Sequence, residues 1–156
     1  MQMSPATQPK PEPCNCLALR QAARHVTQFY DQYLVPTGVR TTQFSILAKL
    51  RHLGPMTINA LAEQMVMDRT TLGRNIQPLE RDGLIAIGRG RSKELRLTEA
   101  GAATLRAATT ARAEAQARFE AAFGAERAAD LRALLRAVTA SELQPAGVEP
   151  IIGEGS

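Results

Sequence analysis

Residues 57–97 read TINALAEQMVMDRTTLGRNIQPLERDGLIAIGRGRSKELRL, and this stretch decides the fold. It contains a short helical pattern over 59–65 and, after a tight turn, a second one over 69–81. Two strand patterns, at 84–87 and 94–97, then enclose a loop that holds glycine and basic residues. Two helices joined by a tight turn and followed by a two-stranded hairpin predict a winged helix-turn-helix.

Helical patterns continue on both sides of this stretch. Apolar residues recur at spacings of three and four over 15–34, and further helices are expected over 42–53, 99–123 and 126–139. Abundant Ala and Leu with only 4% aromatic residues favour helices over sheets. The predicted fold class is mainly α with a small β-hairpin wing: a winged helix-turn-helix plus N- and C-terminal dimerisation helices.

Proline and glycine mark both ends of the chain, where few residues are apolar. We therefore expect a domain organisation of five segments. These are a disordered tail over 1–13, an N-terminal dimerisation helix over 14–41, a winged helix-turn-helix DNA-binding domain over 42–101, C-terminal dimerisation helices over 102–143 and a disordered tail over 144–156.

The two C-terminal helices predict an assembly. The helix over 99–123 would be roughly 35–40 Å long, which is more than a domain of this size covers. The last helix carries an apolar stripe that also needs a partner surface, formed by Leu131, Leu134, Leu135 and Val138. We expect a two-fold homodimer to which the first helix contributes, with packing inside one chain as the alternative.

Composition and charge narrow the classes of partner. With 156 residues, 44% of them hydrophobic and 22% charged, the chain has the composition of a globular protein. The net charge of +4 and pI of about 9.6 favour a polyanionic partner. No apolar run reaches the roughly 18–20 residues that span a bilayer, and the N-terminus lacks a hydrophobic signal core. We therefore expect no membrane partner and a cytoplasmic location.

The helix over 69–81 carries side chains that suit the DNA major groove. Its outward or neighbouring positions hold Arg69, Thr70, Thr71, Arg74, Asn75, Gln77 and Arg81. Arginine pairs with guanine, Asn and Gln pair with adenine, and Thr contacts bases or phosphates. The alternative is a solvated helix face. The adjoining hairpin favours double-stranded DNA, because Arg89, Arg91 and Lys93 could follow the phosphate backbone or enter the minor groove; a solubilising turn is the alternative there.

Several motifs in this region resemble the core of the MarR (multiple antibiotic resistance regulator) family. They are Asp68-Arg69-Thr70-Thr71-Leu72, Arg74, Leu79-Glu80-Arg81, Gly83-Leu84-Ile85 and Leu95-Arg96-Leu97-Thr98-Glu99-Ala100-Gly101. The resemblance covers roughly residues 15–140. It implies a dimer that binds a palindromic operator near its own promoter, usually as a repressor that a small ligand or an oxidant releases.

Three residues depart from the family pattern. Gly73 stands where the family often has a small hydroxyl residue in its recognition helix. Pro78 lies inside the same helix and predicts a kink, since it removes a backbone hydrogen bond. Arg89 replaces the acidic residue of the wing, two positions before Arg91. We therefore expect a more mobile and more cationic wing.

Cys14 and Cys16 open the first helix, where the helix N-terminus favours a reactive thiolate. The apolar stripe predicts that Cys16 faces inward. It stands where the organic hydroperoxide resistance regulators, a branch of MarR, carry a peroxide-sensing cysteine. Tyr30 matches one of the tyrosines that accompany that cysteine, whereas Arg20 stands where the branch has another tyrosine. A buried cysteine that acts as a small hydrophobe is the alternative. The two cysteine sulfurs and the distant histidines of the chain make no standard set of metal ligands.

The alternative trigger is a small aromatic ligand, commonly a carboxylate in the family. It would lie between the dimerisation helices and the reading domain, contacted by Arg20, Arg24, His25, Tyr30 and Tyr33. In the alternative interpretation the tyrosines belong to the hydrophobic core and the basic residues are solvated, so that they bind no ligand. The chain has no phosphate-binding loop, nucleophile motif or metal-ligand set, so we expect neither an enzyme nor a cofactor. A winged-helix module that binds only protein remains as a rival.

Overall fold

The computed structural model describes residues 13–91 and 93–143. Its elements are α1 (Asn15–Leu34), the 3-10 helix η1 (Val35–Thr37), α2 (Thr41–Leu53), β1 (Met56–Thr57), α3 (Ile58–Met65), α4 (Arg69–Arg81), β2 (Ile85–Ile87), β3 (Glu94–Leu97), α5 (Glu99–Phe123) and α6 (Ala125–Ala140). The mainly helical class with a hairpin wing is confirmed. The tails predicted to be disordered lie, apart from Pro13, outside the described residues.

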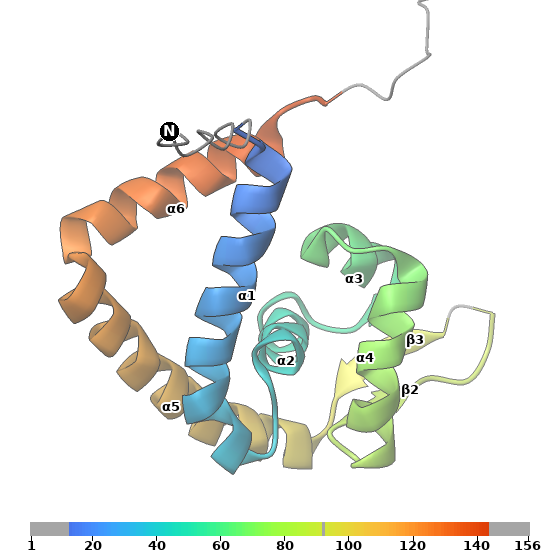
Figure 1. The fold of residues 1–156 in the computed structure, drawn as a ribbon. Coiled ribbons are helices and arrows are strands. Elements are labelled where there is room, and N and C mark those ends of the chain that lie inside the picture. Colours follow the sequence, from blue (N-terminus) through green and yellow to red (C-terminus); the bar gives the residue numbers. More distant parts are fainter. Residues whose placement is uncertain (1–12, 92, 144–156) are drawn as a thin grey trace, which may run out of the picture. The chain divides into compact units, whose positions relative to one another are not determined.

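The chain divides into two compact units, and the boundary between them in the sequence lies between Gln116 and Ala117, inside α5. In the first unit α2 is the central helix, seen end-on in Figure 1, and it contacts α1, α3, α4 and β3. Its buried residues are Phe44, Ile46, Leu47 and Leu50, which point in several directions. Burial on several sides explains why α2 is apolar around much of its circumference.

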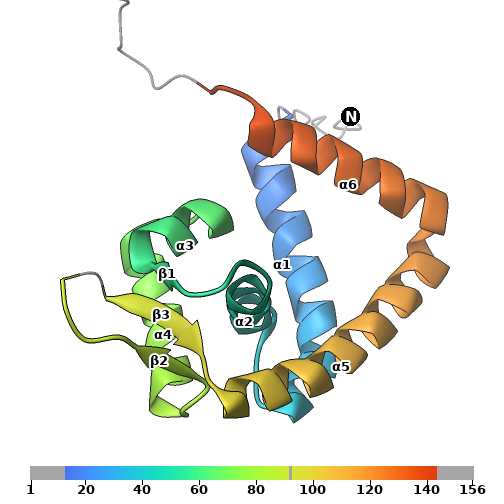
Figure 2. The ribbon, with the colours of Figure 1, turned by 180° about the vertical axis from the view of Figure 1, so that it is seen from behind.

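The sheet has three antiparallel strands in the order β1-β3-β2 (Figure 2). The hairpin strands pair Ile85 with Leu97 and Ile87 with Leu95. The short strand β1, which the sequence analysis did not predict, pairs Met56 with Leu95. Leu95 is buried while its neighbour Arg96 is exposed, so the sheet has a core face and an outer face.

The helix-turn-helix packs through the predicted residues. Leu72, Ile76 and Leu79, expected on the inner face of α4, are between 0% and 3% exposed. They join one core with Leu61 of α3 and Ile85 of β2. Burial of these side chains fixes which face of α4 remains for solvent or for a partner.

Asp31 of α1 fastens the start of α2. Its carboxylate accepts hydrogen bonds from the backbone N–H and the hydroxyl of Thr41, at 2.8 and 2.7 Å, and lies 3.5 Å from Arg40. The bonded N–H is one of those that a helix leaves unpaired at its N-terminus. A side chain from another helix therefore caps α2, which begins one residue earlier than predicted.

The second unit begins at Ala117 and contains the end of α5 and all of α6. Phe119 stacks on Phe123 with ring centroids 5.4 Å apart, and Arg132 forms an ion pair with Glu120 at 3.1 Å. Leu134 and Val138 of α6 are 67% and 46% exposed. In the part of the chain that the structure describes, no helix is long and apolar enough to cross a membrane.

Candidate nucleic-acid interface

Asp68 starts the candidate recognition helix α4. Its carboxylate accepts hydrogen bonds from the hydroxyl of Thr71 at 2.6 Å and from the backbone N–H of Thr71 at 2.8 Å. The hydroxyl bond first, and then the backbone bond, hold the pKa of Asp68 below its ordinary value of 3.8. The charged carboxylate thus caps the helix and fixes the point at which its outward face begins.

The structure divides the seven predicted α4 residues into two groups. Thr71 bonds to Asp68, the side-chain amide of Asn75 donates to the backbone oxygen of Thr71 at 2.9 Å, and Arg81 pairs with Asp82 at 3.3 Å. The other four are exposed and have no such bond among the described residues: Arg69, Thr70, Arg74 and Gln77. Their donors and acceptors are therefore available to a partner on one face of α4.

The turn before α4 contains a backbone conformation that is unusual for its residue. Thr57 caps α3 as a hydrogen-bond acceptor from the Ala60 N–H at 3.2 Å. Val66 ends that helix with φ 51° and ψ 52°, in the left-handed region, and its side chain is 75% exposed. Only Val66 among the described non-glycine residues has a positive φ. The tight turn of the helix-turn-helix is therefore formed at a conformational cost.

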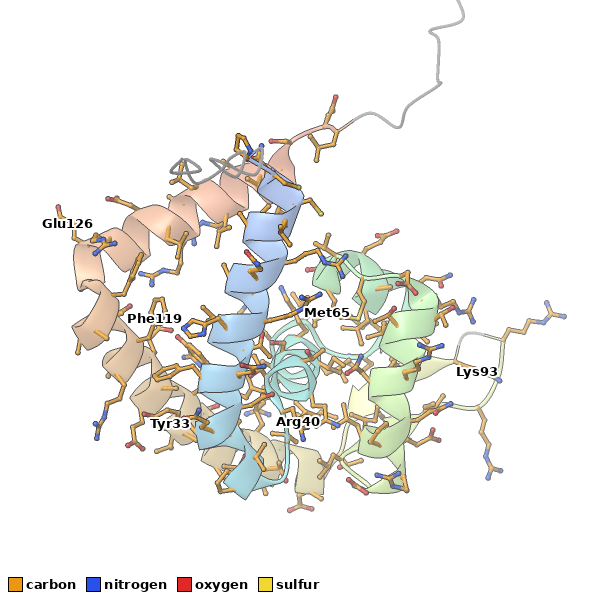
Figure 3. The ribbon with its side chains drawn as sticks, viewed as in Figure 1. Tyr33, Arg40, Met65, Lys93, Phe119 and Glu126 are labelled. Carbon is orange, nitrogen blue, oxygen red and sulfur yellow. The ribbon has the colours of Figure 1, made fainter. Side chains whose placement is uncertain are left out.

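The wing brings its three predicted cations close to one another in the chain. Arg89, Arg91 and Lys93 are exposed on the loop between β2 and β3, where Figure 3 labels Lys93. The Gly88 N–H donates to the Glu94 carbonyl at 2.8 Å and closes the base of this loop. No ion pair between described residues involves a wing cation. The wing therefore presents three cations, with Glu94 as the acidic residue beside them in the chain.

Cys16 differs from the expectation, whereas Cys14 precedes the first helix. Cys14 is the N-cap of α1, and its sulfur accepts from the Leu17 N–H at 3.4 Å. Both thiols are exposed, so the prediction that Cys16 faces inward is wrong for this chain. The apolar stripe itself is uncovered here, since Leu17 and Leu19 are 53% and 40% exposed. Helical spacing identifies an apolar face but does not show what covers it.

The residues predicted to contact an aromatic ligand have mixed surroundings. Arg20, Arg24 and His25 are exposed. Tyr30 donates its hydroxyl hydrogen to Gln116 at 3.1 Å, and the rings of Tyr30 and Tyr33 both lie against Phe29, at 5.9 and 5.4 Å. An open surface hollow of about 370 Å³ lies elsewhere, lined by Leu50, Arg51, Pro55, Arg96, Leu97, Thr98, Glu99 and Ala102. The ligand assignment stays a prediction.

Helix α4 continues through Pro78 to Arg81. Within the described ranges, no three side chains of His, Cys, Asp or Glu gather as a metal site requires.

Comparison with known proteins places this arrangement in a family. The model of the MarR family matches residues 40–88. The M. tuberculosis transcriptional regulator MosR has a TM-score of 0.71 and 34% identity, over 83% of this chain and 98% of that chain. A structure of MosR in complex with DNA gives a TM-score of 0.70 and 35% identity, over 84% and 100% of the two chains.

More distant relatives agree with this assignment. A probable transcriptional regulator from Pseudomonas aeruginosa has a TM-score of 0.73 and 26% identity, over 83% of this chain and 99% of that one. The uncharacterized HTH-type transcriptional regulator YwoH of Bacillus subtilis (strain 168) is 30% identical over 79 residues. That match spans 51% of this chain and only 58% of the relative. From the family model and the nearly full-length similarity to MosR, the chain belongs to the MarR family of transcriptional regulators.

Proposed function

We propose that this protein is a homodimeric repressor that reads a palindromic DNA operator with α4 and the wing. The observation that carries the proposal is a set of exposed polar side chains on α4 that form no side-chain hydrogen bond among the described residues. They are accompanied by a basic loop whose cations form no ion pair there. Arg69, Thr70, Arg74 and Gln77 are exposed, and the wing cations form no ion pair among the described residues. The chain matches the model of the MarR family, and the similar M. tuberculosis transcriptional regulator MosR has a structure in complex with DNA.

The chemistry of the side chains suggests how the sequence would be read. Arg74 would pair with the O6 and N7 atoms of guanine, and Gln77 with adenine, because these side chains match those base edges in the major groove. Arg89, Arg91 and Lys93 would lie along phosphates or enter the minor groove. The side chains of α4 would supply specificity for the base sequence, and the wing cations would supply binding affinity that depends on salt.

The dimer is supported by apolar side chains that the chain leaves uncovered. Leu17 and Leu19 of α1 are exposed, as are Leu134, Leu135 and Val138 of α6. Burial of such side chains is the usual driving force of association. A two-fold axis would present two copies of α4 to half-sites about one helical turn apart, which is why we expect a palindrome.

A salt titration with matched variants tests the proposal. Arg74→Ala should weaken binding to a selected operator at least about fivefold for each half-site, because a bidentate base contact contributes about 1–3 kcal/mol. The triple variant Arg89→Ala, Arg91→Ala, Lys93→Ala should reduce the slope of log affinity against log salt by up to about 5, since each phosphate contributes about 0.9 and a dimer has two wings. Arg106→Ala, an exposed arginine on α5, is the matched control and should change neither.

Unchanged affinity and slope in both variants would reject DNA reading by α4 and the wing. A protein-binding winged-helix module would then be favoured.

A thiol switch is the second part of the proposal. Both cysteines are exposed, and the Cys14 sulfur is a hydrogen-bond acceptor at the start of α1. Peroxide would oxidise the Cys16 thiolate to a sulfenic acid, with release of hydroxide, and so change a side chain in the first turn of the proposed dimerisation helix α1. Oxidation should release the wild-type protein from its operator, and a reductant should restore binding. Release should be absent in Cys16→Ser.

If wild-type protein stays bound under peroxide, the trigger is not a thiol. The search would then turn to an aromatic carboxylate contacted by Arg20, Arg24, His25, Tyr30 and Tyr33.

A further inference from the structure

Gly73 lies in the middle of α4, where nothing within the chain requires glycine. Its backbone is helical, and a Cβ atom added to it would meet no heavy atom within 4 Å apart from its chain neighbours and the adjacent backbone of the same helix. Among the eight described glycines, only Gly73 has both a φ that any residue adopts and space for a Cβ atom with no neighbour within 4 Å outside the adjacent backbone. Five others have positive φ, Gly101 would collide with backbone, and a Cβ on Gly88 would lie 3.4 Å from the Glu94 oxygen.

Glycine is an unfavourable choice at this position. In a helix interior it destabilises the fold relative to alanine, because the unfolded chain gains conformational freedom. The residue therefore lowers stability without improving packing or backbone geometry. A residue that the fold does not need points to a requirement outside the chain.

The neighbours of Gly73 indicate where that requirement lies. On a helix, residues three and four positions apart share a face. Gly73 is thus adjacent to Arg69, Thr70 and Gln77, which are three of the four exposed polar residues of α4 without a side-chain bond among the described residues. It is also adjacent to the buried Ile76 and is itself partly buried, so it lies at the edge of the outward face. Its missing side chain leaves a notch at that edge, beside the polar groups proposed to read bases.

We propose that Gly73 is a specificity-determining residue whose notch admits the C5 methyl group of a thymine in the major groove. This inference rests on the proposed function. The floor of the notch is the α-carbon of Gly73 and helical backbone whose N–H and C=O groups point along the helix axis and not outward. A polar base edge would find no hydrogen-bonding group there. Among groups in the major groove, the thymine methyl is the apolar one that projects outward.

The proposal predicts opposite effects of Gly73→Ala on stability and on binding. The melting temperature should rise by about 2–4 °C, because alanine is the better helix former. Affinity for an operator selected by the wild-type protein should fall on the order of tenfold, as expected when one base contact is spoiled. A variant that is better folded yet binds more weakly cannot be explained by loss of structure.

A bump-and-hole experiment identifies the occupant. Each thymine of the selected half-site is replaced in turn by uracil, which lacks only the C5 methyl group. At one position uracil should weaken binding of the wild-type protein and restore binding of Gly73→Ala. Arg91→Ala, whose defect would lie in the wing, is the control and should not be restored by uracil at that position.

Equal affinity of the wild-type protein and Gly73→Ala would overturn the proposal while leaving the proposed function intact. Weakened binding of Gly73→Ala that no uracil position restores would overturn the assignment of thymine. Failure of the wild-type protein to select any duplex would overturn the proposed function as well.

Discussion

Replacing Gly101 by alanine tests how closely α5 approaches the hairpin. A Cβ atom on Gly101 would overlap the backbone oxygen of Leu84 and lie 2.8 Å from the Cδ1 atom of Leu97. The Leu84 oxygen is fixed, since it accepts from the Thr98 N–H at 3.2 Å, and the Thr98 hydroxyl donates to the Gly83 carbonyl at 2.6 Å. Relief of the overlap therefore requires α5 and the hairpin to separate.

The cost follows from three contributions. Overpacking against backbone costs about 3 kcal/mol, at the upper end of its usual range. Loss of one backbone hydrogen bond adds about 1 kcal/mol. The better helix propensity of alanine offsets about 1 kcal/mol. We expect Gly101→Ala to lower the free energy of unfolding by about 3 kcal/mol.

Urea unfolding at one fixed protein concentration measures this loss, because the stability of a dimer depends on concentration. Gly73→Ala is the matched control, with the same chemical change in a helix where nothing outside the adjacent backbone lies within 4 Å of the added Cβ. It should be more stable than the wild-type protein, as its higher helix propensity predicts. A loss below about 0.5 kcal/mol for Gly101→Ala would refute the close approach.

Two further predictions concern the helix-turn-helix. Val66→Gly should raise the free energy of unfolding by about 1 kcal/mol in urea melts, because glycine adopts the left-handed conformation of Val66 without strain; a destabilised variant would contradict this. Asp68→Ala should lower thermal stability at pH 7, because Thr71 loses its acceptor. Since the folded-state pKa of Asp68 is below 3.8, its contribution is present above that pH and is lost as pH falls through the lower value. The stability gap between wild type and variant should therefore narrow in acid, and a gap that widens would contradict the assignment.

The helix-turn-helix was predictable because its signals are local. Thr57 and Asp68 cap their helices within three residues, and the spacing of Leu72, Ile76 and Leu79 defines one buried face. The position of the wing cations in a hairpin loop could be predicted from the strand patterns on either side of them alone.

Features that depend on distant segments were not predictable. The strand β1 is two residues long and acquires its structure by pairing with β3, nearly forty residues further along the chain. Asp31 caps α2 from another helix, and Gly101 is constrained by Leu84 of the hairpin. These contacts leave no periodic signal in the sequence.

The candidate site shows the same limit on a smaller scale. Periodicity placed Thr71 and Asn75 beside the outward face of α4, but their bonds to Asp68 and to the backbone engage the hydroxyl of one and the side-chain amide of the other. Such short-range bonds compete with external partners. For Cys16 the spacing identified an apolar face that the chain leaves exposed.

The measurement that tests the central claim most directly is a binding titration across several salt concentrations. It compares a palindromic operator selected by the wild-type protein with a scrambled duplex of the same length and composition. We predict tight binding to the operator alone, weakening steeply with salt, and a loss of preference for the operator in Arg74→Ala but not in Arg106→Ala. Weak binding to both duplexes that does not change with salt would contradict it.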